Sequence, residues 1–250
     1  MTAANQPPSK SAVPSPRDAA GWAPAVRALK VGATAPGTLA STVDGRRLVG
    51  PLQGFGKMWQ KTFRVRLAGS DLSPADVVAA WKERFPTFWP KGNTFYAPLA
   101  GIRPGEVALL SVSPAGPMKL HTGVMVLYAD DESFTFMNPE GHVLAAWITF
   151  SAYRDADGTV VAQAQALERA SDPLFELALT FGGHGANNRF WLDTLHNLAA
   201  HFGIDANASA EVVCVDARRQ WRYVGNVRHN ATFRSMLYTL SWPIRRSRRA

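Results

Sequence analysis

The chain has 250 residues, of which 46% are hydrophobic and 10% aromatic. This length and apolar content suffice for a domain with a sizeable core and exclude a wholly disordered chain. The formal net charge is +8, but it is concentrated at the two ends of the chain. The first 50 residues hold six basic and two acidic side chains and the last 40 hold nine and two, whereas residues 51–210 hold twelve and fifteen. The central region is slightly acidic, which argues against nucleic acid as its partner.

The composition also limits the chemistry that the chain can carry. Cys214 is the single cysteine, so neither an intrachain disulfide nor a thiolate metal cluster can form. The six histidines stand in no spacing typical of metal sites, and we expect neither a metal nor a cofactor. The sequence contains no apolar run suited to a secretory signal, and none approaches the roughly 18 residues of a membrane span. These features predict a cytoplasmic protein.

In chain order, residues 1–49 read as a largely disordered Pro/Ala/Ser-rich tail, in which positions 21–49 have enough apolar residues to dock loosely on a domain. A domain is expected at 50–205, and a basic C-terminal extension at 206–250. The stretch 58–69 (MWQKTFRVRLAG) alternates apolar and polar residues except at Lys61, which predicts a strand. Ser73-Pro74-Ala75-Asp76 is typical of a helix N-terminus, and Pro86 is expected to end this short helix.

A run of strands separated by tight turns follows, and connections this short predict antiparallel neighbours. In the last strand, alanines occupy one parity and glutamines the other, which places the small side chains inward. The predicted strands are Glu106–Ser113, Leu120–Tyr128, Glu132–Asn138, His142–Ala152 and Thr159–Glu168.

The segment 186–203 has the strongest helical pattern in the chain. Trp191, Leu195, Leu198 and Phe202 recur at helical spacing, and Gly203 stands where a helix-ending glycine is expected. An amphipathic helix needs a sheet to cover its apolar stripe, so the sequence predicts an α+β domain.

The order of strand, short helix, meander and long helix resembles the helix-grip fold, a curved antiparallel sheet wrapped around a C-terminal helix. The stretches 141–150 (GHVLAAWITF) and 188–198 (NRFWLDTLHNL) are similar to an actinobacterial-type branch of the START-like superfamily, also called SRPBCC. The resemblance extends from about Leu52 to Ile204, and no catalytic motif of the polyketide cyclases in that superfamily can be matched to it. It implies a cavity between sheet and helix that holds a lipid, an aromatic or a polyketide-like molecule.

Candidate ligand-binding residues follow from this expectation. Glu168 shares the inward parity of the alanines and would act as an acid or base if buried, although a solvated, frayed strand end at Glu168 and Arg169 is the favoured interpretation. His121 could contact a ligand, or could be an ordinary sheet histidine. The full candidate set is His121, Ala162, Ala164, Ala166, Glu168, Trp191, Leu195 and Leu198.

Three functions stay open on the sequence alone. The leading hypothesis is binding of a small hydrophobic molecule, and the second is a cyclase- or dehydratase-like enzyme that uses the same cavity. The third is a membrane-peripheral interaction domain without a ligand, since apolar residues and an arginine cluster between Arg228 and Arg249 could contact an anionic membrane.

Overall fold

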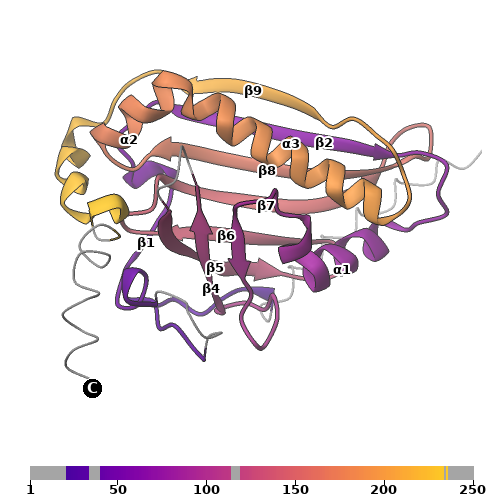
Figure 1. Cartoon of the computed structure of the whole chain (residues 1–250), viewed down its shortest axis with the longest axis horizontal. Coiled ribbons are helices and arrows are strands. Elements are labelled where there is room, and N and C mark those ends of the chain that lie inside the picture. The colour runs from indigo at the N-terminus through magenta and orange to yellow at the C-terminus, as the bar shows by residue number, and fades with distance from the viewer. Residues whose placement is uncertain (1–20, 34–39, 114–118, 234, 236–250) are drawn as a thin grey trace, which may run out of the picture.

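The computed structural model describes residues 21–33, 40–113, 119–233 and 235. Within this part of the chain, nine antiparallel strands form one sheet in the order β3-β4-β5-β6-β7-β8-β2-β9, and β1 pairs with β6 (Figure 1). The strands are β1 (Leu48–Val49), β2 (Met58–Leu67), β3 (Thr94–Tyr96), β4 (Val107–Val112), β5 (Leu120–Ala129), β6 (Ser133–Pro139), β7 (Leu144–Arg154), β8 (Val160–Ala170) and β9 (Ser209–Asp216).

The helices lie mainly on one face of this sheet, which we call the inner face (Figure 1). The long helix α3 runs along β2 and β8, while α1 packs on β7 and β8 toward the other end. The α-helices are α1 (Pro74–Arg84), α2 (Pro173–Ala178) and α3 (His184–His201), and the short 3-10 and π segments are η2 (Ala40–Thr42), η3 (Pro51–Gln53), η4 (Phe85–Phe88), η5 (Leu179–Gly183) and η6 (Trp221–His229). Because β2 and α1 precede the meander and α3 follows it, the predicted helix-grip fold is confirmed.

Local chemistry explains the two principal helices. The Ser73 side chain accepts a hydrogen bond from the Asp76 N–H at 3.2 Å, and the Asp76 carboxylate accepts one from the Ser73 N–H at 2.9 Å. These reciprocal bonds satisfy backbone donors that the first turn of α1 leaves open. In α3, Leu195 and Leu198 are fully buried against the sheet, whereas Asp193 and His196 are exposed. The predicted apolar stripe is therefore confirmed at its centre.

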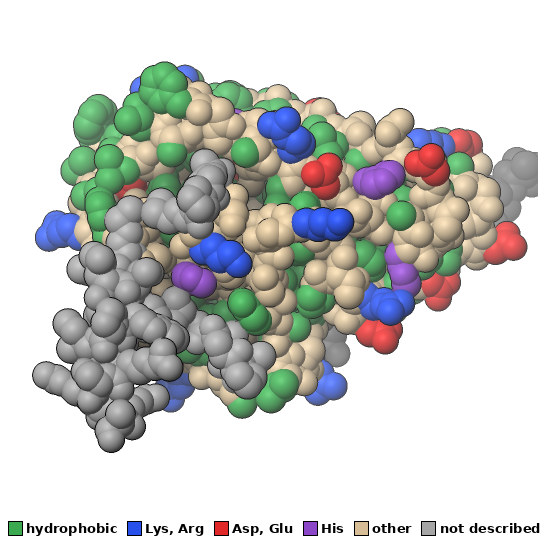
Figure 2. Space-filling view, viewed as in Figure 1, with side chains coloured by type: hydrophobic (Ala, Val, Ile, Leu, Met, Phe, Trp, Pro, Cys, Tyr) green, Lys and Arg blue, Asp and Glu red, His purple; other side chains and the backbone are tan. Residues whose placement is uncertain are grey.

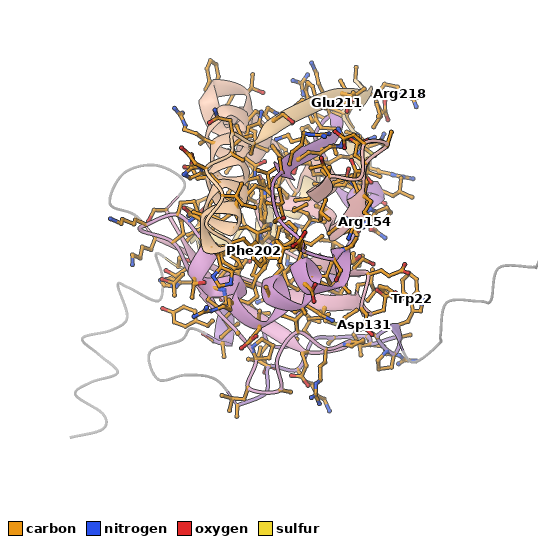
Figure 3. All side chains as sticks on the ribbon, turned by 90° about the vertical axis from the view of Figure 1, so that its right-hand side faces the viewer. Trp22, Asp131, Arg154, Phe202, Glu211 and Arg218 are labelled. Atoms are coloured by element: carbon orange, nitrogen blue, oxygen red, sulfur yellow. The ribbon has the colours of Figure 1, made fainter. Side chains whose placement is uncertain are left out.

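The outer face is covered by residues that precede the predicted domain boundary. Leu29 and Val43 are buried there against Met125 of β5, and the backbone of Ala23 donates to Leu127 at 2.8 Å. Figure 3 shows Trp22 on the opposite side of the sheet from α3. Residues 21–33 and 40–49 thus dock on the sheet through a few buried side chains, while residues 1–20 lie outside the described part.

The C-terminal extension also joins the fold, beyond the predicted domain end at residue 205. β9 pairs with β2 over Met58 to Arg64, and the Arg169 guanidinium donates to the carbonyl of Arg218 at 2.9 Å and to the Asp216 carboxylate at 2.5 Å. Arg169 is therefore 2% exposed, and the favoured interpretation of a solvated strand end is wrong. The extension itself covers that end of β8.

Apolar side chains are exposed where α2, η5 and η6 meet at one end of the molecule (Figure 2). Leu177, Phe181 and Trp221 are 57%, 80% and 70% exposed. Most of the Arg-rich segment predicted to contact a membrane, residues 234 and 236–250, lies outside the described residues.

Candidate functional site

A polar position on β8 separates two apolar clusters of the inner face. The alanines at 162–166 belong to the larger cluster beneath α1 and α3, and Ala170 belongs to the smaller cluster beneath α2. Glu168 lies between them on the same parity, opposite Ala146 of β7. The alternation of side chains along a strand therefore directs a carboxylate into the apolar interior.

The partner of this carboxylate is Lys61 of β2, the residue that interrupts the apolar parity of its strand. Lys61 Nζ lies 2.8 Å from Glu168 Oε1, and the two side chains are 0% and 2% exposed. Lys61 Nζ also donates to Asn187 Oδ1 at 3.0 Å and lies 3.4 Å from His184 Nδ1, both in the first turn of α3. The ammonium group thus has one carboxylate counter-charge and two hydrogen-bond acceptors around it.

A buried ion pair of this kind is weak evidence for a role in stability, since removing both charges from water costs about as much as their attraction returns. Titratable groups that converge in an apolar interior are instead common at functional sites. We therefore take Lys61, Glu168, His184 and Asn187 as the candidate site and call them the polar cluster.

The environment of His184 keeps its imidazole neutral. Burial and then the charges of Lys61 and Lys57 lower the pKa of His184 to about 4. Because an ammonium can only donate, His184 Nδ1 must accept from Lys61, and the ring hydrogen is then on Nε2. His184 is half-buried, with the ring of Trp59 5.1 Å away between centroids. Its Nε2–H is a donor that the polar cluster leaves available.

Stability should fall in mild acid because the fold holds both His184 and His142 neutral. Burial lowers the pKa of His142, like that of His184, to about 4. Both groups have an ordinary pKa of 6.5, so between pH 6.5 and 4 the unfolded chain binds more protons than the folded chain. The contribution of these two histidines to the free energy of unfolding is complete above pH 6.5 and decreases as the pH drops toward 4. We expect His184→Gln to make this decrease shallower, as measured by urea unfolding at several pH values. An unchanged slope would show that His184 is not held neutral by the fold.

Two further buried polar atoms, one on a residue that contacts His184 and one on the residue that follows Asn187, have no hydrogen-bond partner among the described residues. They are Trp59 Nε1, a donor, and Asn188 Oδ1, an acceptor. Trp59 shares the parity of Lys61 on β2, and Asn188 precedes Trp191 by one helical turn on the apolar stripe of α3. Buried polar atoms normally find partners, so these two are consistent with a ligand that supplies them.

The predicted site residues do not all gather at the polar cluster. Ala162, Ala164 and Ala166 face inward as predicted, at 0%, 0% and 2% exposure, and Leu195 and Leu198 of α3 pack in the same cluster. Trp191 is only partly buried and contacts Phe150, with 5.5 Å between ring centroids.

His121 lies elsewhere, and its placement corrects the prediction. Its parity on β5 is that of Met125, which packs with Leu29 and Val43 on the outer face. The side chain of His121 therefore projects away from α3. Lys61 was not among the predicted site residues, although its interruption of the apolar side of its strand was the available signal. His184 was not among them either, because the glycines at 182, 183 and 185 favour a plain turn over an anion-binding site at this position.

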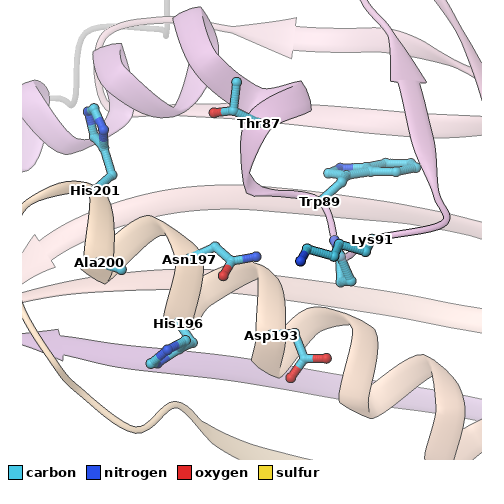
Figure 4. Close-up of a pocket in the computed structure, with 9 residues that line it drawn as sticks. Thr87, Trp89, Lys91, Asp193, His196, Asn197, Ala200 and His201 are labelled. Atoms are coloured by element: carbon cyan, nitrogen blue, oxygen red, sulfur yellow. The ribbon is translucent and has the colours of Figure 1, made fainter.

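A separate groove of about 650 Å³ lies on the other side of α3 (Figure 4). It runs between α3 and the segment after α1, where the Asn197 side chain donates to the carbonyl of Phe88 at 3.0 Å. None of the predicted ligand-binding residues lines it. The lining residues are Thr87, Trp89, Pro90, Lys91, Asp193, His196, Asn197, Ala200 and His201.

The described residues offer no group of three or more His, Cys, Asp or Glu side chains arranged to hold a metal ion. In the same part of the chain, no helix has the length and apolar character needed to cross a bilayer.

No protein-family model and no curated protein matches this chain. Solved structures with a similar fold include a START superfamily protein from Mycobacterium smegmatis, at 18% identity, a TM-score of 0.41, and coverage of 59% of this chain and 99% of that one. Major latex-like protein 151 from Panax ginseng follows at 11% identity and a TM-score of 0.38, covering 58% and 98%. Ara h 8.0201 is 13% identical with a TM-score of 0.37, covering 57% and 97%.

The resemblance to the START-like superfamily is confirmed as one of fold, since the order of elements and the single antiparallel sheet are those of the helix grip. The identities are low and the TM-scores lie near 0.4, so what the chain binds has to be argued from its own residues.

Proposed function

We propose that this chain binds a small hydrophobic molecule between the sheet and the first turns of α3, with the polar cluster at one end of the ligand. The observation that carries the proposal is the buried Lys61–Glu168 pair, set among small side chains in an apolar interior. Ala146 lies opposite Glu168, and Ala166 lies opposite Lys61 on the neighbouring strand. Apolar sites usually gain orientation and specificity from a few polar groups placed in this way.

The chemistry of the polar cluster suggests what the ligand should carry. His184 Nε2–H and Trp59 Nε1–H are donors, and Asn188 Oδ1 is an acceptor. A largely apolar ligand with one end that both accepts and donates, such as a hydroxyl or an enolisable carbonyl, complements this set. The membrane contact suggested for the C-terminal segment stays a prediction.

A second candidate function is catalysis at the same place. The Lys61 ammonium lies 2.8 Å from the Glu168 carboxylate and 3.4 Å from the His184 imidazole, and a neutral imidazole and a carboxylate around one ammonium could transfer protons to or from a bound molecule. Binding and catalysis differ in what leaves the protein, since an enzyme would release a changed molecule.

The proposed site can be tested by filling it. Ala166→Phe adds a ring beside Lys61, and we expect it to abolish binding of an apolar fluorescent probe that the wild type binds. Gln165→Phe is the matched control, because it adds the same ring to the next position of β8, on the outer face, and should leave probe binding unchanged. In a solid core, Ala166→Phe would instead cost about 1–3 kcal/mol of stability through overpacking. That cost, in a protein whose wild type binds no probe, would overturn the proposal.

Native mass spectrometry of gently purified full-length protein would identify the ligand. We expect a co-purifying small molecule that is lost in Ala166→Phe and kept in Gln165→Phe. Incubation of the recovered molecule with fresh protein then separates the two candidate functions, because a change in its mass or isomer composition would indicate catalysis.

A further inference from the structure

The two ends of the sheet are finished very differently. At one end, β3 has three residues, Thr94–Tyr96, and presents little free backbone. At the other end, β9 has eight residues, Ser209–Asp216, and within the described part of the chain no strand pairs with its outer edge. Figure 1 shows β9 along the border of the molecule, and Figure 3 shows Glu211 and Arg218 near that border.

Most of the outer edge of β9 lacks the usual features that prevent strands from pairing. Natural edge strands are protected by lysine, proline, bulges or short length. β9 contains neither lysine nor proline, and its one irregularity, a bulge at Val215 where the pairing with β2 skips from Cys214 to Asp216, leaves Ser209–Cys214 regular. Its valines at positions 212, 213 and 215 are 40%, 46% and 45% exposed. An exposed edge with high β-propensity is therefore available to a further strand.

The two acidic residues of β9 are already paired within their own chain. The Glu211 carboxylate lies 3.1 Å from Arg64 Nη1, and the Asp216 carboxylate lies 2.5 Å from Arg169 Nη2 and 3.0 Å from Arg218 Nε. Intrachain arginines thus offset both charges. Two identical edges can approach one another without the like-charge repulsion that bare carboxylates would cause.

We propose that β9 of one chain pairs antiparallel with β9 of a second copy, joining two sheets about a two-fold axis perpendicular to them. With this symmetry, the inner faces of the two sheets lie on the same side of the joined sheet only if residues opposite each other are both odd-numbered or both even-numbered. The register centred on Val213 satisfies that condition. In this register Val213 meets its own copy and Val212 meets Cys214 within the regular part of β9, while Glu211 lies opposite the bulge at Val215, so no like charges lie opposite each other. A two-fold contact closes on itself, which explains why a second copy, rather than an open fibre, occupies the edge.

The test is the oligomeric state of the full-length chain over a range of concentrations, by sedimentation equilibrium. We expect the wild type and Val213→Thr to form a concentration-dependent dimer, because Thr keeps the β-branched shape. Val213→Lys should be a monomer, since two ammonium groups would then lie directly opposite each other. Circular dichroism and thermal unfolding establish that the variant is folded.

A mixing experiment separates pairing at Val213 from indirect effects. Val213→Glu alone should also be monomeric, but an equimolar mixture of Val213→Lys and Val213→Glu should recover the dimer as a mixed species. A monomeric wild type at every concentration, or a dimer that Val213→Lys leaves intact, would overturn the proposal. Loss of the dimer would not affect probe binding at the polar cluster, so this inference stands apart from the proposed function.

Discussion

Lys61→Met is expected to lower the free energy of unfolding by about 3–5 kcal/mol, because it leaves the Glu168 carboxylate buried without its counter-charge. Glu168 is 2% exposed and lies in a strand flanked by apolar clusters, so water cannot readily replace the lost ammonium. Chemical denaturation at neutral pH measures the change. An effect below about 1 kcal/mol would be typical of a solvated ion pair and would contradict the burial seen in the structure.

The double variant Lys61→Met, Glu168→Leu separates stability from function. Replacing both members of a buried ion pair by apolar residues is often neutral or stabilising, so most of the loss should be recovered. Under the proposed function, the double variant should nevertheless fail to retain the small molecule that we expect to copurify with the wild type, since the polar end of the site is gone. Arg66→Met is the control within β2: Arg66 pairs with Asp155 and Asp157 at the surface, and its loss should cost at most about 1 kcal/mol.

The sequence predicted the elements in which apolar residues recur regularly along the whole helix or strand. The strands of the meander, the capped helix α1 and the stripe of α3 follow from local patterns of hydrophobicity and turn residues, and the structure confirms them. The ends of the chain were harder to predict. β9 contains three valines, but apolar and polar residues do not alternate along it. An edge strand that buries neither of its sides has no need of that alternation, so the pattern that predicts strands is missing here.

The candidate site was predicted only in part, for a physical reason. The inward direction of Glu168 follows from the period of two along β8, but whether that end of β8 is solvated depends on residues far away in sequence. Arg169 is covered by the extension around Asp216 and Arg218, and Glu168 is paired by Lys61 more than 100 positions earlier. Only the registers of β2 with β8 and of β2 with β9 bring these groups together.

Leu195→Ala should destabilise the chain by about 2–5 kcal/mol, as the loss of a large side chain from a packed core does. Leu195 is fully buried at the centre of α3, in the cluster that contains Leu198 and the alanines of β8. Since the helix lies on β2 and β8 through these contacts, a cavity here weakens the attachment of α3 to the sheet. Asp193→Ala is the matched control on the same helix, because Asp193 is exposed and off the stripe, and its effect should stay within about 0.5 kcal/mol. Urea unfolding with an unchanged dependence on denaturant gives both values, and equal losses at the two positions would mean that the buried face of α3 is assigned wrongly.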